Sequence, residues 1–537
     1  MKKALYILIP LLIAVILRLY PTLITGMPFS TDGWPIIRNT QLLMSNTPIP
    51  LNSHIFDGYN NYMPANSIFS AILSEVTGAA PLNSMAIGIP IVGALAIPIF
   101  YVLVNRLTKN SKISLIASIL LATAFPYALF SAGITKETFA SPIYMLLIFL
   151  FLLKHDRKTT VLFSVVSVAL VLSHQLTSFL TIAAISVLTV GLYINKSNRE
   201  QNLNSYKSNI LFLGILSTIA GVYFGFLATP ALIVTLTASD FITVGAYATL
   251  VTSGIIYVVL KPLKTTPTGT ILKCSLSFLI ATGILLLITR VPFLPGAPTL
   301  PVTYFLYATP FLIAAPLIAY GLNDLQKNNF SLVVPVFWLA AILSLAMYTV
   351  FANVLGGAGF IYRFLDFLLP PMVALAAVGL YKAHGAVPWH LKTWRFSKFA
   401  AVALIVIMAV TSAYTLYAAV SLQEPYLGYF WGYKPTEYAA SNWVSLNGNN
   451  QTVAVDVKTQ YLLSDYFGVN VSTYSGLNYL QGNGSPPNII YIYNQMKTNG
   501  YVLYEGSPVT LPVNWTDKLS DYNIVYANNE VTIYAEK

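Results

Sequence analysis

Long apolar runs separated by short polar segments account for most of this 537-residue chain. About 20 apolar residues in a row are enough to cross the hydrocarbon core of a bilayer as a helix. The pattern therefore predicts a polytopic α-helical membrane protein with about 13 spanning helices. The thirteen runs are 4–24, 82–104, 113–130, 138–153, 159–174, 176–194, 210–228, 241–260, 274–289, 303–321, 331–351, 364–383 and 399–420.

The first segment between spanning runs, residues 25–81, is much longer than the others and has a pattern of its own. Apolar residues recur in it at helical spacing in two places, which predicts two amphipathic helices lying in the membrane interface. The residues concerned are Ile36, Ile37, Leu43 and Met44 in the first helix, and Ile68, Phe69, Ile72, Leu73 and Val76 in the second. A polar and aromatic turn region, 52–64, separates them.

The composition becomes polar after about residue 420, which divides the chain into a membrane domain, 1–420, and a small α/β domain, 421–537. Short patterns ended by glycine or asparagine predict the elements of this second domain. They are helices at 436–446 and 461–467, strands at 452–457, 489–493 and 501–504, and a hairpin of 524–527 with 531–535. Four Asn-x-Ser/Thr sequons, at Asn450, Asn470, Asn483 and Asn514, fit an external location.

Charge sets the expected orientation. Only 9% of the residues are charged, the mean hydropathy is +0.68 and the net charge is +11. With the N-terminus in the cytoplasm and alternating spans, the inner segments hold 19 of the 29 basic residues, as the positive-inside rule requires. The first run is interpreted as a retained helix. We therefore expect a cell-membrane protein with an extracytoplasmic C-terminal domain and no nucleic-acid partner, and the single Cys274 excludes a disulfide framework.

Ionisable groups beside spanning helices are costly and are therefore functional candidates. Asp32, in Phe29-Ser30-Thr31-Asp32-Gly33-Trp34, follows the first run on the outer side. It could equally be the N-cap of a helix that begins near Trp34 and Pro35. Lys136 and Glu137 form the next outer loop with Gly133-Ile134-Thr135. They could equally be a loop ion pair, with Glu137 in the first turn of a helix.

Two further candidates lie near later spanning runs. His174, in Ser173-His174-Gln175-Leu176-Thr177, is alternatively a buried turn histidine bonded to the backbone. Arg363 is a candidate clamp for a lipid phosphate, because its planar donors suit that group. Alternatively it pairs with Asp366 or extends toward the interface. An outer segment rich in proline, 291–302, is a candidate flap.

Together these features resemble the GT-C superfamily of membrane glycosyltransferases, which use sugars linked to polyprenyl phosphate. The resemblance covers residues 1–420 and rests on the order of soft motifs. These are Asp32 after the first run, the long first loop with Tyr62-Met63-Pro64, Gly133-Ile134-Thr135-Lys136-Glu137, the turn around His174, and Arg363 before Pro370-Pro371.

The resemblance implies roles for the matching positions. Asp32 would be the general base, or the carboxylate that orients the acceptor, in an inverting transfer. Glu137 would be a second acid that shares a divalent metal, Mg²⁺ or Mn²⁺, with Asp32. Lys136 and Arg363 would neutralise the donor phosphate, and His174 would lie near the donor headgroup.

Thirteen spans with an external C-terminal domain are most similar to the catalytic subunit of an oligosaccharyltransferase. However, the tail has no Trp-Trp-Asp-Tyr-Gly-like motif and segment 291–302 contains no acid. The resemblance therefore favours transfer of a monosaccharide or small glycan to a protein, lipid or glycan acceptor, as in the protein O-mannosyltransferase and lipid-modifying branches. Transfer of N-glycans to protein stays open as a second function.

Two functions without catalysis are also compatible with a polytopic chain. One is a flippase for lipid-linked glycans, for which charges near the bilayer midplane and internal repeats would be expected. Neither is apparent in the sequence. The second is a membrane anchor that displays the C-terminal domain, which would leave the long first loop and Lys136-Glu137 without a purpose.

Overall fold

The structure is a computed structural model that describes residues 2–46, 56, 58–194, 206–231, 238–260, 267–291, 299–325, 333–351, 362–383, 398–425, 427–448, 451–503 and 508–537. Contacts divide the chain into two compact units. Unit 1 comprises Met1–Leu17, Val92–Ser131 and Phe139–Thr415, and unit 2 comprises Arg18–Ile91, Ala132–Thr138 and Leu416–Lys537. Segments 25–81 and 133–137 are therefore both in the same unit as the C-terminal domain.

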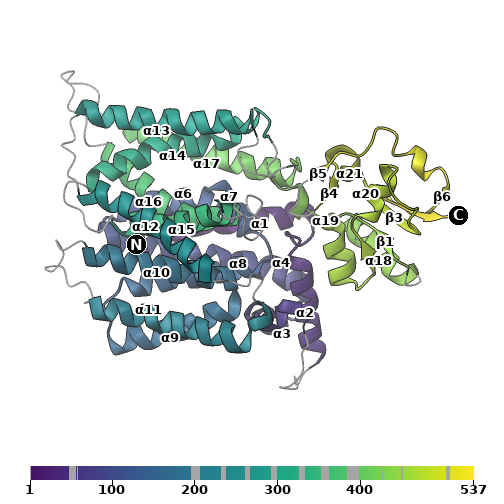
Figure 1. Cartoon of the computed structure of the whole chain (residues 1–537), viewed down its shortest axis with the longest axis horizontal. Coiled ribbons are helices and arrows are strands. Elements are labelled where there is room, and N and C mark those ends of the chain that lie inside the picture. Colours follow the sequence, from purple (N-terminus) through teal and green to yellow (C-terminus); the bar gives the residue numbers. More distant parts are fainter. Residues whose placement is uncertain are drawn as a thin grey trace. The chain divides into compact units, whose positions relative to one another are not determined.

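Unit 1 is a bundle of apolar helices that run side by side (Figure 1). The helices that lie in it wholly or largely are α5 (Ala96–Thr108), α6 (Ser111–Thr123), α7 (Phe125–Phe130), α8 (Lys136–Phe151), α9 (Arg157–Ser173), α10 (Gln175–Ile194), α11 (Tyr206–Val222), α12 (Ala238–Leu260), α13 (Pro267–Ile288), α14 (Tyr304–Leu325), α15 (Val333–Phe351), α16 (Leu365–Ala383) and α17 (Lys398–Val420). The π-helical turn η3 (Tyr223–Leu227) continues α11, and the 3₁₀ turn η4 (Thr229–Ala231) follows it.

Small residues permit close helix packing in this bundle. A Cβ atom on Gly379 of α16 would lie 1.9 Å from the carbonyl oxygen of Leu317 in α14, and one on Gly321 of α14 would lie 2.4 Å from that of Leu375. Any side chain at these two glycines would force the helices apart. Backbone contact of this kind is typical of helix pairs in membranes, where dispersion replaces the hydrophobic effect as the driving force.

Every one of the thirteen predicted runs coincides with a helix or a pair of helices. Run 82–104 contains α4 (Pro81–Ala94) and α5, which meet at Leu95, and run 113–130 contains α6 and α7. Within the described residues, nine helices are long and apolar enough to cross a membrane. The chain is thus a multi-pass membrane protein, while the total of 13 spans stays a prediction.

The described residues of segment 25–81 form α2 (Gly33–Ser45), the 3₁₀ turn η1 (Gly58–Tyr62) and α3 (Ala65–Thr77), which follow α1 (Lys2–Thr25). Both predicted helices are present, while their position in the membrane interface stays a prediction. In α3, however, the apolar residues Ile68, Ile72 and Val76 are 44%, 59% and 80% exposed. Its small and polar face is buried instead, and the hydroxyls of Ser74 and of Ser84 in α4 are 2.6 Å apart. An exposed apolar face suits a helix that lies against lipid.

The C-terminal domain is built on a five-stranded sheet, in the order β2-β1-β3-β7-β6 (Figure 1). The strands are β1 (Val453–Ala454), β2 (Val471–Ser472), β3 (Ile489–Tyr493), β6 (Tyr522–Ala527) and β7 (Val531–Glu536), and β4 (Tyr501–Val502) pairs with β5 (Pro508–Val509). β1 is parallel to β2 and β3, whereas β7 is antiparallel to β3 and β6. The helices are α18 (Pro435–Asn447), α19 (Val457–Gln460), α20 (Ser475–Leu480) and α21 (Asn494–Asn499), with the 3₁₀ turns η7 (Tyr429–Trp431) and η10 (Asp517–Leu519).

Most of the helices and strands that the sequence predicted for this domain are present. The first predicted helix is α18, which ends before Gly448, and strand 489–493 and the terminal hairpin are also confirmed. Predicted helix 461–467 is the π-helical turn η8 (Tyr461–Tyr466), and Gly468 after it has φ +75°. Strand 452–457 is shorter than predicted, since α19 begins at Val457. Most of segment 291–302, the end of strand 501–504 and Asn450 lie outside the described residues.

Candidate functional site

Asp32 lies in a turn between α1 and α2 whose backbone is unusual at Ser30. Ser30 has φ +90°, a conformation that side chains other than glycine rarely adopt. Its N–H donates to the carbonyl of Trp431 in the C-terminal part of the same unit, at 3.0 Å. Strained backbone of this kind persists where surrounding structure imposes it, and it is frequent at functional sites. Asp32 does precede α2 directly, but its side chain makes no capping bond to that helix.

The loop 133–137 packs directly on this turn. The N–H of Ile134 donates to the carbonyl of Phe29 at 3.0 Å. A Cβ atom added to Gly33 would lie 3.1 Å from the Cβ of Ile134, which is closer than side chains normally approach. The structure therefore joins the segments that carry Asp32, Lys136 and Glu137.

Lys136 is held by the first loop. Its side chain is largely buried, with 8% of the residue exposed, and its ammonium group donates to the side-chain oxygen of Asn60 in η1 at 2.5 Å. The amide of Asn66 at the start of α3 donates to the carbonyl of Thr135 at 3.2 Å. Asn60 and Asn66 were not among the predicted site residues. For Asn60 the signal available in the sequence was the polar turn before Pro64, whereas Asn66 follows that proline and had no such signal.

Glu137 is in the first turn of α8, where the sequence placed it in the alternative of a loop ion pair. The helix dipole favours an anion at this end. Carboxylate oxygens such as those of Asp32 and Glu137 are the ligands that Mg²⁺ prefers, and this ion is usually held by one or two carboxylates and by phosphate oxygens of the substrate. Among the described residues no group of three or more His, Cys, Asp or Glu side chains is placed to hold a metal. A metal shared by Asp32 and Glu137 therefore stays a prediction.

His174 and Arg363 are in unit 1 and are described by their own surroundings. His174 is the single residue between α9 and α10, as the predicted tight turn requires, and its ring bonds to the hydroxyl of Thr177 at 2.6 Å. His174 is thus a turn histidine, as one alternative expected, and this bond joins its ring to a side chain. The guanidinium of Arg363 lies 5.7 Å from the centre of the Tyr362 ring, and its Nε donates to the Tyr362 hydroxyl at 3.3 Å.

Trp34, two residues after Asp32, is fully buried against aromatic side chains of the C-terminal domain. The centre of its ring lies 5.2 Å from that of Tyr433, 5.9 Å from that of Tyr438 and 5.3 Å from that of Tyr466. Edge-to-face and stacked ring pairs at these separations are favourable beyond the area that they bury. The sequence placed Trp34 only at the start of a helix and held no signal for these partners.

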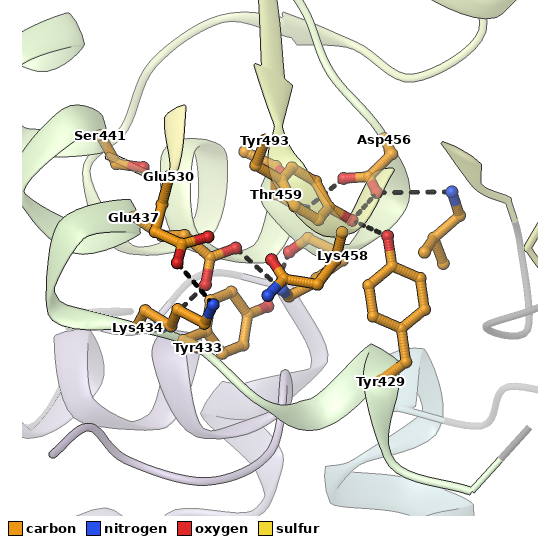
Figure 2. Close-up of polar contacts among 12 residues, drawn as sticks. Tyr429, Tyr433, Lys434, Glu437, Ser441, Asp456, Lys458, Thr459, Tyr493 and Glu530 are labelled. Atoms are coloured by element: carbon orange, nitrogen blue, oxygen red, sulfur yellow. Dashed lines mark hydrogen bonds and ion pairs between the residues drawn. The ribbon is translucent and has the colours of Figure 1, made fainter. Parts of the chain in front are cut away.

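Tyr433 also belongs to a buried polar network, which Figure 2 shows. Lys458, which has no exposed surface, pairs with Glu437 at 2.8 Å and lies 4.5–5.5 Å from the ring centres of Tyr493, Tyr433 and Tyr429. A second carboxyl group, that of Asp456, accepts from the Tyr493 hydroxyl at 2.5 Å and from the Thr459 N–H at 2.8 Å.

Burial governs the ionisation of this network. It raises the pKa of the Asp456 carboxyl above its ordinary value of 3.8, although the hydrogen bonds from Tyr493 and Thr459 and the charge of Lys458 act in the opposite direction. Burial likewise raises the pKa of Tyr433 well above 10.0, with the charge of Glu437 as the next cause. The Tyr433 hydroxyl is therefore a neutral donor, and it bonds to the carbonyl of Lys458 at 2.6 Å.

The chain is thus a multi-pass membrane protein in which segments 25–81 and 133–137 belong to one unit with a small α/β domain. Its fold is that of the GT-C membrane glycosyltransferases, as the sequence resemblance predicted. The particular likenesses are to solved structures of the oligosaccharyltransferase of Archaeoglobus fulgidus. The structure in the apo form aligns with a TM-score of 0.58 and 15% identity over 100% of this chain and 74% of that chain.

Two further structures of the Archaeoglobus fulgidus protein give similar results. The complex with an inhibitory peptide and a dolichol-phosphate aligns with a TM-score of 0.56 and 14% identity, over 100% of this chain and 74% of that one. The complex with Zn and sulfate aligns with a TM-score of 0.50 and 14% identity, over 99% and 73%. No protein-family model and no curated protein matches the sequence. At these identities the likeness establishes the fold.

Proposed function

We propose that this protein is a membrane glycosyltransferase that moves a sugar from a polyprenyl-phosphate donor to a protein, lipid or glycan acceptor at the outer face of the membrane. The observation that supports this most is the joining of the Asp32 turn to the loop of Lys136 and Glu137, through the bond between Ile134 and Phe29. It brings a candidate base and a candidate phosphate-binding cation onto one framework in a chain with the GT-C fold.

In the proposed reaction an acceptor hydroxyl or amide attacks the anomeric carbon on the face opposite the phosphate. The bond between that carbon and the phosphate oxygen breaks, and the polyprenyl phosphate leaves with the electron pair. The acceptor's proton passes to the Asp32 carboxylate, which acts as the general base. Attack from the opposite face inverts the configuration of the sugar.

Cations stabilise the leaving group, because negative charge on the phosphate grows as the bond breaks. Lys136 is suited to this role, since it is largely buried and Asn60 restrains its ammonium group. We assign Arg363 to the same phosphate and His174 to the donor headgroup. A divalent metal held by Asp32 and Glu137, when bound, would supply further positive charge at the phosphate.

A second candidate is transfer of an oligosaccharide to asparagine. It is favoured by the structures of the Archaeoglobus fulgidus oligosaccharyltransferase, which align over the whole of this chain. One of them is tethered to an acceptor peptide containing an Asn-Val-Thr sequon. Against it stands the absence from residues 421–537 of a Trp-Trp-Asp-Tyr-Gly-like sequence.

The test uses purified full-length protein in lipid nanodiscs with a panel of radiolabelled polyprenyl-phosphate sugars. Acceptors are a sequon peptide, a peptide containing Ser and Thr, and a lipid extract of the host. Wild type is compared with Asp32→Asn, which keeps the side-chain size but removes the base, and with Asp57→Asn as a control for loss of an acid from the first loop. Transfer from one donor that is lost only in Asp32→Asn is the expected result.

Label appearing in the sequon peptide would identify the second candidate, whereas label in the remaining acceptors would support the first. Equal transfer by wild type and Asp32→Asn would exclude Asp32 as the base. If neither protein turns over any donor although both are folded, the glycosyltransferase proposal fails, and movement of the lipid-linked sugar between leaflets becomes the reaction to measure.

A further inference from the structure

Resting on the proposed function, we propose that the C-terminal domain is a positioning device for Asp32, with Tyr433 as its central residue. In this view Tyr433 and the buried pair of Glu437 and Lys458 hold Trp34, and through it the turn that carries the base. The domain is then part of the catalytic apparatus through the backbone of the first outer loop.

One face of α2 is attached to the C-terminal domain. Trp34, Arg38 and Gln41 are spaced i, i+4 and i+7 and therefore share one face of this helix. Trp34 packs against Tyr433, Arg38 donates to the carbonyl of Asp465 at 3.4 Å, and Gln41 donates to the hydroxyl of Tyr466 at 3.1 Å. The helix that begins directly after Asp32 is thus bound along its length to the C-terminal domain.

The turn itself is attached at its N-terminal end as well. The bond from the Ser30 N–H to the Trp431 carbonyl fixes the residue with φ +90°. The ring of Phe29 lies edge-on to that of Trp431, with 6.3 Å between their centres. Asp32 therefore lies between two points, at Ser30 and at Trp34, that are both anchored to the segment from 431 to 433.

A network of buried hydrogen bonds makes that segment rigid. The Tyr433 hydroxyl donates to the Lys458 carbonyl, and the Lys458 ammonium bonds to the Glu437 carboxylate, whose second oxygen accepts from the Lys434 N–H at 2.7 Å (Figure 2). These contacts form a closed circuit around residues 433–437, and the side chains of Tyr433, Glu437 and Lys458 are all buried. Buried polar groups that bond to one another make the structure around them rigid.

Loss of this positioning should lower the rate, because displacement of a catalytic group by about 1 Å costs on the order of a hundredfold. Removing the Tyr433 hydroxyl takes away one buried hydrogen bond and leaves the ring in place. We expect a fall in kcat of about fivefold, in proportion to one such bond. The KM for the donor should change little, since none of these residues is assigned to the donor.

The experiment compares Tyr433→Phe with Tyr522→Phe in full-length protein in nanodiscs. Tyr522 is a matched control in the same domain, because its hydroxyl also donates to a backbone carbonyl, that of Pro487, at 2.8 Å. Two quantities are measured: kcat and KM for the donor, and hydrogen exchange of the peptide that contains residues 29–34. Tyr466→Phe, which removes the bond to Gln41, is a second test variant.

The expected result is faster exchange at residues 29–34 and a lower kcat in Tyr433→Phe and Tyr466→Phe, with neither change in Tyr522→Phe. Unchanged exchange and kcat in both test variants would overturn the proposal. Equal changes in Tyr522→Phe would also overturn it, by pointing to general loosening of the domain. If wild type shows no transferase activity, the proposed function fails, whereas the exchange measurement still decides whether the domain positions the Asp32 turn.

Discussion

The buried ion pair of the C-terminal domain makes a direct prediction about stability. Replacing Lys458 by methionine removes its ammonium group and keeps a side chain of similar length. Lys458 has no exposed side-chain surface and that of Glu437 is 4% exposed, so the remaining carboxylate stays out of water without its cation. Breaking a buried pair by removing one partner costs roughly 3–5 kcal/mol of folding free energy.

The expected loss is large relative to the stability of a domain, which is about 5–15 kcal/mol. The urea dependence of stability for a small domain is about 1–3 kcal/mol per molar. Dividing the expected loss of roughly 3–5 kcal/mol by this urea dependence, Lys458→Met should lower the urea midpoint of the domain by about 2 M. The midpoint can be measured on full-length protein in nanodiscs by brief proteolysis at increasing urea, following cleavage within residues 416–537.

Two further variants decide the cause of the loss. Lys434 pairs with Glu530 at 2.7 Å, but the two side chains are 32% and 22% exposed. Lys434→Met should therefore cost about 1 kcal/mol at most. The double variant Glu437→Gln with Lys458→Met removes both charges and should recover much of the loss. This account fails if Lys458→Met lowers the midpoint no more than Lys434→Met does.

Three more outcomes are expected. Arg363→Ala should reduce kcat/KM for the donor by about 10- to 100-fold, which corresponds to the loss of a hydrogen bond to a charged group. Arg363→Lys should reduce kcat/KM less. Equal reductions in the two variants would point to bidentate binding or packing. Full activity in excess chelator would rule out the metal assigned to Asp32 and Glu137, whereas loss restored by Mg²⁺ or Mn²⁺ is expected. Burial raises the pKa of the Asp456 carboxyl in the folded protein. The stability that this carboxyl contributes is therefore fully present below its unfolded pKa of 3.8, and it is lost as the pH rises through the folded pKa. Asp456→Asn should therefore gain in urea midpoint relative to wild type as the pH is raised above 3.8, and a constant difference would contradict this.

The positions of the helices were available from the sequence. Each apolar run coincides with helix because a segment in lipid must satisfy its own backbone, which a helix does without partners. The hairpin around Asn528 and Asn529 and the stop at Gly468 were equally local, since the turn chemistry of a few residues determines them. Asp32 and the Lys136-Glu137 pair could be chosen as candidates because charge beside a spanning helix is rare.

The surroundings of those candidates came from long-range packing. No local pattern relates Ser30 to Trp431, Lys136 to Asn60 or Trp34 to Tyr433, since each pair is separated by dozens to hundreds of residues. The exposed apolar face of α3 is a similar case, because periodicity predicts two faces without saying which one the protein buries. Local patterns thus defined the helical segments and the acid that is a candidate base. The neighbours of that acid depend on the folded geometry of the whole unit, because contacts across such separations form only when distant segments pack together.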